Sequence, residues 1–558
     1  SGGTNSDVSF LGVSLFTAGL SEQPIYCAPV SISSANDIDL LLLSFNLMSK
    51  KILLLLIFLY VNVVNAQVKP AEDATLNYRL IGFSVPVQRA AKTYVLEVSS
   101  TPSTDVNVFE RGIIVKTEAS TNKAIITVPQ FDTKYAWRAT CKDKTGKILN
   151  QSKIYFFATG TCEYLNPERY KLDVYTRSEE HKDLLVILDH SSIIYNMAGE
   201  PVWFLPEVPG VFQRDKRTRD LKPTADGTFT VLNDFGAFEF DYDGNVLWKA
   251  PDNGKVSGDT FERYHHEFTK LSNGHYLVAG YEKIYLPIPS DKFDYSKIPI
   301  DETIKNESGK LLKRIDCGTI IEYDKDGNIV WSWKSSNYFK EEDFFSNIFP
   351  DGTPNTNTHL NAVFFDETRN YVYASFRDIS TILKIQYPSG IVVRKYGKPV
   401  ERQRDGMERV PFKAQHSCRI SKDGLLYLFN NNTARTRDVV SNISFYEEPE
   451  TAGGSLKKVW EFKCDIDSFA APGSASGGSV YMLKDSTILA CMGIEGRVFV
   501  AKYDKTLLWN AVPRYKNDLG IWEVLPQYRT SMIESDTDIT KFVFKKQIIT
   551  KSKNKISR

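Results

Sequence analysis

One short unit recurs along this chain and limits the folds that are open to it. The unit reads roughly Asp, one or two residues, Gly, an apolar pair and Trp. Its copies end, in chain order, at Trp203, Trp248, Trp331, Trp460 and Trp509. A degenerate copy, YPSGIVVRKY, carries Arg394 where the Trp would stand, so the chain holds six units. Self-similarity of this kind predicts a repeat architecture rather than one shared core.

Each unit is accompanied by a hairpin signal. The segments ADGTFTVL, SNGHYLVA, TRNYVYAS, KDGLLYLF and KDSTILAC each place a turn before alternating apolar residues. Such alternation, bounded by Asp-Gly or Asn-Gly turns, is typical of antiparallel strands joined by tight hairpins. Six sheet-like units at irregular spacings of about 45 to 85 residues favour an all-β, six-bladed β-propeller with loop insertions over a sandwich.

The segment before the repeats has a different pattern. Residues 67–162 contain KAIITVPQFDTKYAWRATCKDKTGKILNQSKIYFFATG, in which an apolar strand, a turn and a hairpin follow one another. This resembles a small fibronectin III or immunoglobulin-like β-sandwich. Such a module commonly packs against a neighbouring domain or forms a dimer contact, so a homodimer stays open. We predict the propeller over residues 163–540 and a C-terminal tail over 541–558.

The residues from Met48 to Ala66 have the plan of a signal peptide. A basic pair precedes the apolar run ILLLLIFLYV and a short VNA ending, and the apolar part is short for a membrane span. We therefore predict an exported protein that begins near Gln67 and has no stable membrane insertion after cleavage. Residues 1–47 are treated as an extraneous leader. An uncleaved apolar run acting as an anchor is the competing interpretation.

Composition and cysteine usage exclude some partners and leave others open. A formal net charge of +1 with 25% charged residues gives no electrostatic case for nucleic acid or for anionic membranes. Six cysteines lie outside the leader, of which Cys141 and Cys162 flank one hairpin and could form a disulfide. Cys418 could act as a nucleophile beside a histidine base, but an export compartment oxidises free thiols, so this hypothesis ranks low.

Three of the seven histidines stand at the same point of the repeat. His266 and His416 each precede the turn glycine of a hairpin by eight residues, and His359 precedes an equivalent turn by the same distance. If the repeats surround an axis, equivalent positions face one another. We therefore expect these three imidazoles to converge on one catalytic site. His265 is an alternative to His266 and a candidate substrate-binding residue.

Further polar residues accompany His359. Asn361 follows two residues later, and Arg377 stands in the middle of an apolar strand. An ion pair between Arg377 and Asp378 is the ordinary structural interpretation, whereas an anion site would use its planar fork of donors. Three histidines could also bind Zn²⁺, with Glu267 nearby, although a neighbouring guanidinium opposes a cation. Tyr264 is a candidate for lining an aryl pocket.

These segments resemble the arylsulfate sulfotransferase family of bacterial exported enzymes. The resemblance rests on HHEFTKLSNGHYLV, on His359, Asn361 and Arg377, and on QHSCRISKDGLLYLFNN. It implies that His416 is transiently sulfated, that His266, His359 and Arg377 hold the sulfuryl oxygens, and that the protein is periplasmic. Cys418 and Arg419 after the nucleophile depart from the family pattern and leave acceptor preference open.

The chemistry suits these residue types. Sulfuryl transfer has a loose, in-line transition state like phosphoryl transfer, and a neutral imidazole is a competent nucleophile at pH 7. We expect ping-pong transfer from a phenolic sulfate donor to a phenol acceptor, with neither metal nor cofactor. No Gly-rich phosphate cradle is present for a nucleotide donor. A metal-dependent hydrolase and a non-catalytic carbohydrate-binding or protein-binding propeller are the alternative functions.

Overall fold

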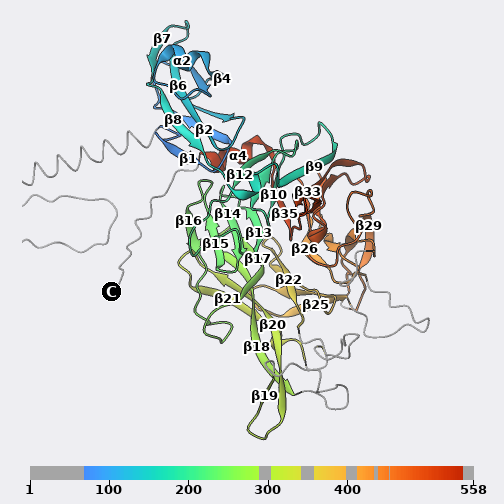
Figure 1. The fold of residues 1–558 in the computed structure, drawn as a ribbon. Helices are drawn as coiled ribbons and strands as arrows, with labels where there is room; N and C mark the ends of the chain where they lie inside the picture. Colours follow the sequence, from blue (N-terminus) through green and yellow to red (C-terminus); the bar gives the residue numbers. More distant parts are fainter. Residues whose placement is uncertain are drawn as a thin grey trace, which may run out of the picture. The chain divides into compact units, whose positions relative to one another are not determined.

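The computed structural model describes residues 68–287, 303–340, 343, 357–397, 411–432, 438–451 and 453–544. The predicted leader, the predicted signal peptide and the tail from residue 545 lie outside these ranges. Within them the chain is mostly β, as predicted (Figure 1). No helix of the described residues is long and apolar enough to span a bilayer.

The N-terminal part forms two sheets. One has the strand order β1-β8-β6-β3-β4 with β7 attached to β6, and the other pairs β2 with β5. Their elements are β1 (Ala74–Leu76), β2 (Leu80–Ser84), β3 (Thr93–Ser99), α2 (Val106–Arg111), β4 (Ile113–Ala119), β5 (Lys123–Thr127), β6 (Thr133–Lys142), β7 (Ile148–Gln151) and β8 (Tyr155–Thr159). Trp137 and Phe83 meet edge to face in the core with ring centroids 5.1 Å apart. The predicted small N-terminal β unit is confirmed.

Six antiparallel sheets follow in the described part of the chain. The first holds β35 (Thr530–Ile533), β10 (Leu185–Leu188), β11 (Ile193–Tyr195) and β12 (Pro201–Phe204). The second holds β13 (Thr218–Pro223), β14 (Phe229–Asn233), β15 (Gly236–Phe240) and β16 (Val246–Lys249). The third holds β17 (Tyr264–Lys270), β18 (Tyr276–Pro287), β20 (Leu311–Tyr323) and β21 (Ile329–Lys334), with β19 (Thr303–Lys305) on β20.

The remaining sheets repeat the same order of hairpins. The fourth holds β22 (Leu360–Asp366), β23 (Tyr371–Phe376), β24 (Thr381–Gln386) and β25 (Val392–Gly397). The fifth holds β26 (His416–Ile420), β27 (Leu426–Asn430), β28 (Asn442–Glu447) and β29 (Lys457–Lys463). The sixth holds β30 (Ser479–Met482), β31 (Ile488–Cys491), β32 (Val498–Ala501) and β33 (Leu507–Lys516), with β34 (Trp522–Val524) and β9 (Tyr170–Arg177) on β33. Short helical turns are η1 (Glu163–Leu165), η4 (Ser335–Asn337) and η5 (Gly493–Glu495).

The repeated tryptophans join successive sheets. Each lies on the fourth strand of its sheet, and its indole N–H can reach a carbonyl in the last turn of the next sheet. Nε1 donates from Trp203 to Tyr242 O at 2.8 Å, from Trp331 to Pro388 O at 2.9 Å, from Trp460 to Tyr503 O at 2.7 Å and from Trp509 to Met197 O at 2.9 Å. The last of these bonds runs from the sixth sheet to the first.

Other side chains make the two remaining junctions. Trp248 of the second sheet lies on Tyr276 of the third, with ring centroids 3.8 Å apart. Where Arg394 replaces the Trp, Glu448 of the fifth sheet accepts hydrogen bonds from the fourth, at 2.6 Å from Tyr396 Oη and 2.7 Å from Lys384 Nζ. At the degenerate repeat a partly buried polar junction therefore takes the place of the indole bond.

The C-terminal end of the described chain returns to the first sheet. Strand β35 pairs antiparallel with β10, with Thr530 opposite Leu188. It is followed by helix α4 (Ser535–Val543), which the hairpin pattern did not predict. Phe542 on this helix packs on Phe229 with ring centroids 4.9 Å apart, and Val543 is fully buried.

The cysteines are unpaired in the described residues. Cys141 is buried in the core of the N-terminal unit, and Cys162 packs against a different apolar cluster. The disulfide between them that the sequence suggested is not formed, because each side chain is occupied by its own apolar surroundings. The thiol of Cys418 is fully buried and its pKa is raised to about 12 by that burial, which disfavours the thiolate a nucleophile needs.

We expect Trp509→Phe to lower the free energy of unfolding by roughly 2 to 3 kcal/mol, because it removes buried ring area and leaves the Met197 carbonyl without its donor. Trp331 makes the same hydrogen bond from a partly exposed position, so Trp331→Phe is the matched control with an expected loss below about 1 kcal/mol. Urea midpoints of both variants measure the difference. Equal losses would contradict a special role for the junction between the sixth and first sheets.

Candidate active site

A backbone irregularity recurs where four first strands begin. The pairing register shifts between Arg219 and Lys222, Tyr264 and Phe268, Leu360 and Ala362, and His416 and Arg419. Beside these shifts the backbone is left-handed, with φ of 55° at Asp220, 63° at His266, 58° at His359 and 54° at Ser417. A bulge re-aims side chains out of the alternating pattern. The first strands of four sheets therefore turn polar side chains out of the regular strand pairing at the same point.

Two of the predicted histidines are in direct contact. Nε2 of His266 lies 3.2 Å from Nε2 of His359, and Nδ1 of His266 lies 2.6 Å from Nδ1 of His265. Burial lowers the pKa of His265 to about 3 and that of His266 well below its usual value. These two contacts join His265, His266 and His359 into a row of three rings, called the histidine row below. Because a neutral imidazole carries one N–H, one ring of each contact must donate its proton to the other. Proton positions at the three rings are therefore coupled.

Arg377 and His359 meet at one carboxylate. Nδ1 of His359 lies 3.3 Å from Oδ2 of Asp378, and Nη1 of Arg377 donates to Oδ1 of the same group at 2.7 Å. Burial opposes ionisation of Asp378, but His359 and Arg377 outweigh it and lower its pKa. The ordinary ion pair that the sequence suggested is thus present. Arg377 also donates from Nη2 to Ala475 O at 3.0 Å, while its buried Nε has no hydrogen-bond partner in the part of the chain that the structure describes.

His416 is fully buried at the start of β26. Its Nδ1 lies 2.8 Å from Oδ1 of Asn431, and Nδ2 of that amide donates to the carbonyls of Ser474 at 2.8 Å and Gly477 at 3.0 Å. These two bonds orient the amide so that its oxygen faces the ring. Nδ1 of His416 therefore carries the proton, and Nε2 has the free electron pair. Burial, followed by the charge of Arg377, lowers the pKa of His416 to about 3.

A backbone donor and a tyrosine lie next to His416. The N–H of Gly477 points at Nε2 of His416 from 3.3 Å. Gly477 has φ of 70°, and a Cβ there would lie 2.9 Å from Tyr528 O, so only glycine allows this approach. The ring of Tyr528 lies 5.5 Å from that of His266 and 6.0 Å from that of His416. Its buried hydroxyl has no hydrogen-bond partner within the described ranges, and burial raises the pKa of Tyr528 to about 12.

The other predicted residues have different positions. Asn361 is fully buried and donates from Nδ2 to Gln415 O at 2.7 Å, which links β22 to the residue before His416. Tyr264 donates its hydroxyl to Pro251 O and lies 2.9 Å from Tyr323 Oη, so this group is committed to the framework. His265, His266 and Tyr264 all line one cavity.

The cavity has a volume of about 400 Å³. Its lining combines aromatic rings with charged groups: Phe235, Phe261, Tyr264, Tyr281, Arg217, Arg219, Arg263, Asp234, Asp252 and Glu262, besides His265 and His266. A cavity of this size accommodates a substituted aromatic ring. It opens beside the histidine row and gives the site a place for a small aryl molecule.

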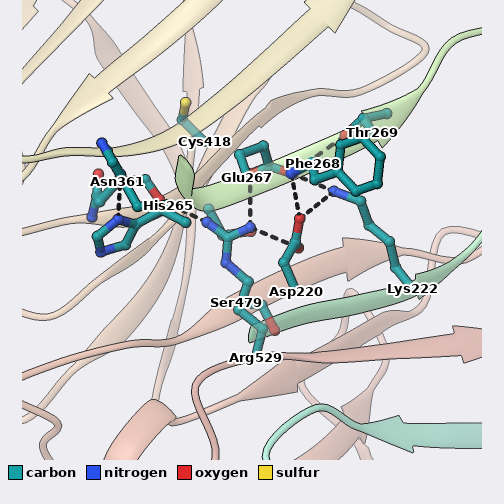
Figure 2. A network of polar contacts seen from close by, with 12 residues as sticks. Asp220, Lys222, His265, Glu267, Phe268, Thr269, Asn361, Cys418, Ser479 and Arg529 are labelled. Carbon is teal, nitrogen blue, oxygen red and sulfur yellow. Dashed lines mark hydrogen bonds and ion pairs between the residues drawn. The ribbon is translucent and has the colours of Figure 1, made fainter. Parts of the chain in front are cut away.

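A buried ionic network lies next to these groups (Figure 2). Nη1 of Arg529 lies 2.9 Å from Oδ1 of Asp220 and 2.7 Å from Oε2 of Glu267, and Nη2 donates to Asn361 O at 2.6 Å. Lys222 bonds both carboxylates from the other side. Glu267 is thus held by Arg529 and Lys222 instead of facing the histidines. No group of three or more metal-binding side chains in the described ranges is arranged to hold a metal ion.

Sequence reasoning missed three residues at this site. Arg219 stands eight residues before Gly227, the same spacing that marks His266 and His416, so a search of the repeat position for any residue type would have found it. Asn431 and Tyr528 reach His416 only through space, from a following strand and from the segment before β35. No spacing in the sequence marks either of them.

Comparison with known proteins adds one clear relationship. No curated protein matches this chain. Among solved structures, a protein of unknown function from Bacteroides caccae is similar at TM-score 0.37 and 12% identity, covering 66% of this chain and 100% of its own. A catalytically inactive virginiamycin B lyase from Staphylococcus aureus is similar at TM-score 0.29 and 11% identity, covering 57% of this chain and 86% of its own. Scores this low define neither fold nor function for this chain.

The sequence itself matches one family. The profile described as Arylsulfotransferase (ASST) aligns with residues 171–463, more than half of the 558 residues. This range contains the histidine row, Arg377, His416 and Asn431. The chain belongs to the arylsulfotransferase (ASST) family.

Proposed function

We propose that this protein transfers a sulfuryl group from an aryl sulfate to a phenol through a sulfated His416, without a nucleotide donor. Family membership supports the class of reaction. The observation that carries the proposal is the state of His416: a buried, neutral imidazole whose Nδ1 is bonded to Asn431 and whose Nε2 retains its electron pair. A site that only bound a ligand would not need this arrangement.

We infer that the six sheets are the blades of a closed β-propeller, preceded by a fibronectin III or immunoglobulin-like sandwich. Indole bonds at four of the six junctions, including the bond from Trp509 to Met197 between the sixth and first sheets, support closure. Pairing of β35 with β10 supports it independently. Closure explains how His266, His359 and His416, each on a different sheet, come to one place.

In the proposed first step, Nε2 of His416 attacks the sulfur of the aryl sulfate. A nitrogen–sulfur bond forms, the bond between sulfur and the aryl oxygen breaks, and the phenolate leaves with the electron pair. Asn431 accepts a hydrogen bond from Nδ1 but cannot take the proton, so the sulfated ring keeps it. The cationic ring is then a good leaving group for the second step.

Donors around His416 stabilise the sulfuryl oxygens in this proposal. Nε of Arg377 and the Tyr528 hydroxyl have no partner among the described residues. The N–H of Gly477 donates to Nε2 of His416 and would pass to a sulfuryl oxygen once that nitrogen bonds sulfur. Preorganised donors of this kind act strongly where water is excluded. In the transition state, negative charge spreads over the three equatorial sulfuryl oxygens. These hydrogen-bond donors would already be in place to stabilise it.

In the second step a phenol takes the sulfuryl group, and its proton must go to a base. The row of His265, His266 and His359 ends at Asp378 and lies beside the cavity. We propose that this row takes the proton of the acceptor and returns it to the departing phenolate in the reverse direction. Nε2 of His416 is then restored for another cycle.

Export to the periplasm and small phenolic partners complete the proposal. Both rest on the sequence pattern of residues 48–66 and on the family resemblance. A metal-dependent hydrolase and a binding propeller are distinguished from the proposed transferase by the first experiment below.

Incubation with 4-nitrophenyl sulfate, without acceptor or nucleotide and with a chelator, should add the mass of one SO₃ group to the intact protein. His416→Asn should abolish the adduct. His275→Asn is the matched control, because His275 lies in a partly exposed hairpin against Glu322 and should leave the adduct intact. An adduct of wild-type stoichiometry in His416→Asn would refute the nucleophile. Loss of all activity with chelator would favour a metal enzyme.

The rate of sulfation by 4-nitrophenyl sulfate should not change between pH 7 and pH 5. The pKa of His416 is about 3, so the nucleophile stays unprotonated over this range, and a nitrophenolate leaves without a proton. Stopped-flow release of nitrophenolate, read at a pH-independent wavelength, measures it. Unfolded histidines titrate near a pKa of about 6.5, so the fold loses stability below that pH and intact folding must be checked. An inflection near pH 6.5 in the folded enzyme would contradict a depressed pKa.

Arg377→Gln should lower kcat by roughly 100-fold, about 3 kcal/mol of barrier, because one preorganised donor is removed. Arg377→Lys keeps the positive charge but loses the planar pair of donors, so its kcat should lie between those of the wild-type enzyme and Arg377→Gln. Arg394→Gln is the control, since among the described residues the Arg394 side chain bonds only the neighbouring carbonyl of Val393, on the fourth strand of its sheet. Steady-state rates with a phenol acceptor test this. A change below about threefold in Arg377→Gln would exclude the proposed role.

A further inference from the structure

We propose that the cavity beside His266 binds aryl partners carrying a second anionic group, a carboxylate or a sulfonate, and that Arg219 recognises this group with Arg217 at the rim. The inference rests on the proposed function, because it names the class of phenol that the site would accept. It concerns residues that the transfer step itself does not use.

Arg219 holds a position in the repeat that elsewhere belongs to histidine. It precedes Gly227 by eight residues, as His266 precedes Gly274 and His416 precedes Gly424. The register shift of β13 begins at Arg219, and the residue after it has φ of 55°. The second sheet thus contributes a guanidinium to the same centre to which other sheets contribute imidazoles.

The guanidinium of Arg219 has no acceptor within hydrogen-bonding distance among the described residues. Its recorded contact is with the ring of Tyr528, whose centroid lies 5.8 Å from Cζ. Arg529 has three acceptors and Arg377 has two. Burial and the neighbouring charge of Arg217 lower the pKa of Arg219. A desolvated, unpaired cation is costly, so an anionic ligand here would be favourable.

The lining carboxylates do not neutralise this charge by contact. Glu262 accepts the backbone N–H groups of Val256 at 2.7 Å and Ser257 at 3.1 Å, and Asp252 accepts the N–H of Glu262 at 2.9 Å. Asp234 acts on Arg219 only through its field.

The third lining arginine is already occupied. Arg263 lies 3.4 Å from both Asp259 Oδ2 and Tyr281 Oη, so it is less available to a ligand. Its Nε is buried without a partner in the described ranges, but both terminal nitrogens are engaged. Arg219 and Arg217 are the lining arginines whose side chains make no hydrogen bond to another described residue.

The position of Arg219 fits a substituent rather than the sulfuryl group. Arg219 lines the cavity, whereas His416 does not, and both lie near the ring of Tyr528, at 5.8 Å from Cζ of Arg219 and 6.0 Å from the ring of His416. His265 and His266 line the same cavity as Arg219. A para-substituted phenol could therefore place its oxygen at the histidine row and its anionic group at Arg219, with the ring among Phe235, Phe261 and Tyr281.

The test compares 4-hydroxybenzoate, 4-hydroxybenzenesulfonate and the neutral 4-hydroxybenzamide as acceptors of one donor. Wild-type enzyme should prefer an anionic acceptor to the amide in kcat/KM. In Arg219→Gln this preference should fall roughly tenfold or more, and Arg219→Lys should retain part of it. Arg263→Gln is the matched control and should leave the preference within about threefold. Comparison of 4-hydroxybenzoate with 4-hydroxybenzenesulfonate shows whether the cavity prefers a carboxylate or a sulfonate.

Several outcomes would overturn the inference. One is a wild-type kcat/KM for the anionic acceptors that is no higher than that for 4-hydroxybenzamide. This outcome needs no variant, so it decides the question even if Arg219→Gln does not fold. Equal losses for the anionic and neutral acceptors would assign Arg219 to the sulfuryl group instead. Calorimetric binding of 4-hydroxybenzoate and the amide separates the two proposals. Selective binding that depends on Arg219, without any transfer, would support the cavity and refute the sulfotransferase; transfer without selectivity would do the reverse.

Discussion

A buried guanidinium holds together the residues on which the site depends. Arg529 bonds Asp220, Glu267 and the carbonyl of Asn361, which come from three sheets, and its own backbone continues into the strand that pairs with β10. With Lys222 the two cations balance the two carboxylates. Removing one partner of such a buried pair leaves an uncompensated charge and costs about 3 to 5 kcal/mol. Three network residues directly follow a residue of the site: Arg219 precedes Asp220, His266 precedes Glu267, and Tyr528 precedes Arg529.

Because network residues and site residues are adjacent in sequence, the ionic network makes the site rigid and also keeps its polarity low. The backbone is left-handed at Asp220 and His266, and adjacent residues share it, so fixing Asp220 or Glu267 in the network also fixes the neighbouring Arg219 or His266 at the site. The same packing buries His416 and partly buries His265 and His266 at the cavity wall, which lowers the pKa of all three and keeps their imidazoles neutral. Near the histidines, the charges of Arg377 and Asp378 are paired with each other, and that of Arg219 lies where the proposed anionic ligand would bind.

Much of this arrangement follows from periodicity, and some of it does not. The hairpin pattern predicts the sheets. The repeated Trp, or Arg394 in the degenerate copy, identifies the fourth strand of each sheet. The histidine positions follow from equivalence within the repeat. Arg219 obeys the same rule and was missed because only histidines were compared. Asn431 and Tyr528 depend on contacts between segments distant in sequence, for which a single chain gives no signal. Helix α4 is held by packing of Phe542 and Val543 rather than by a strong amphipathic pattern.

The central claim is that sulfur becomes bonded to one nitrogen of His416 inside a ring of converging side chains. A crystal structure of the protein trapped with a slowly reacting aryl sulfate, without acceptor, tests it most directly. The account predicts sulfuryl density on Nε2 of His416, with oxygens within hydrogen-bonding distance of Arg377 Nε and the Gly477 N–H. Density on Nδ1, on another residue, or with His266, His359 and Arg377 turned away from it would contradict the account.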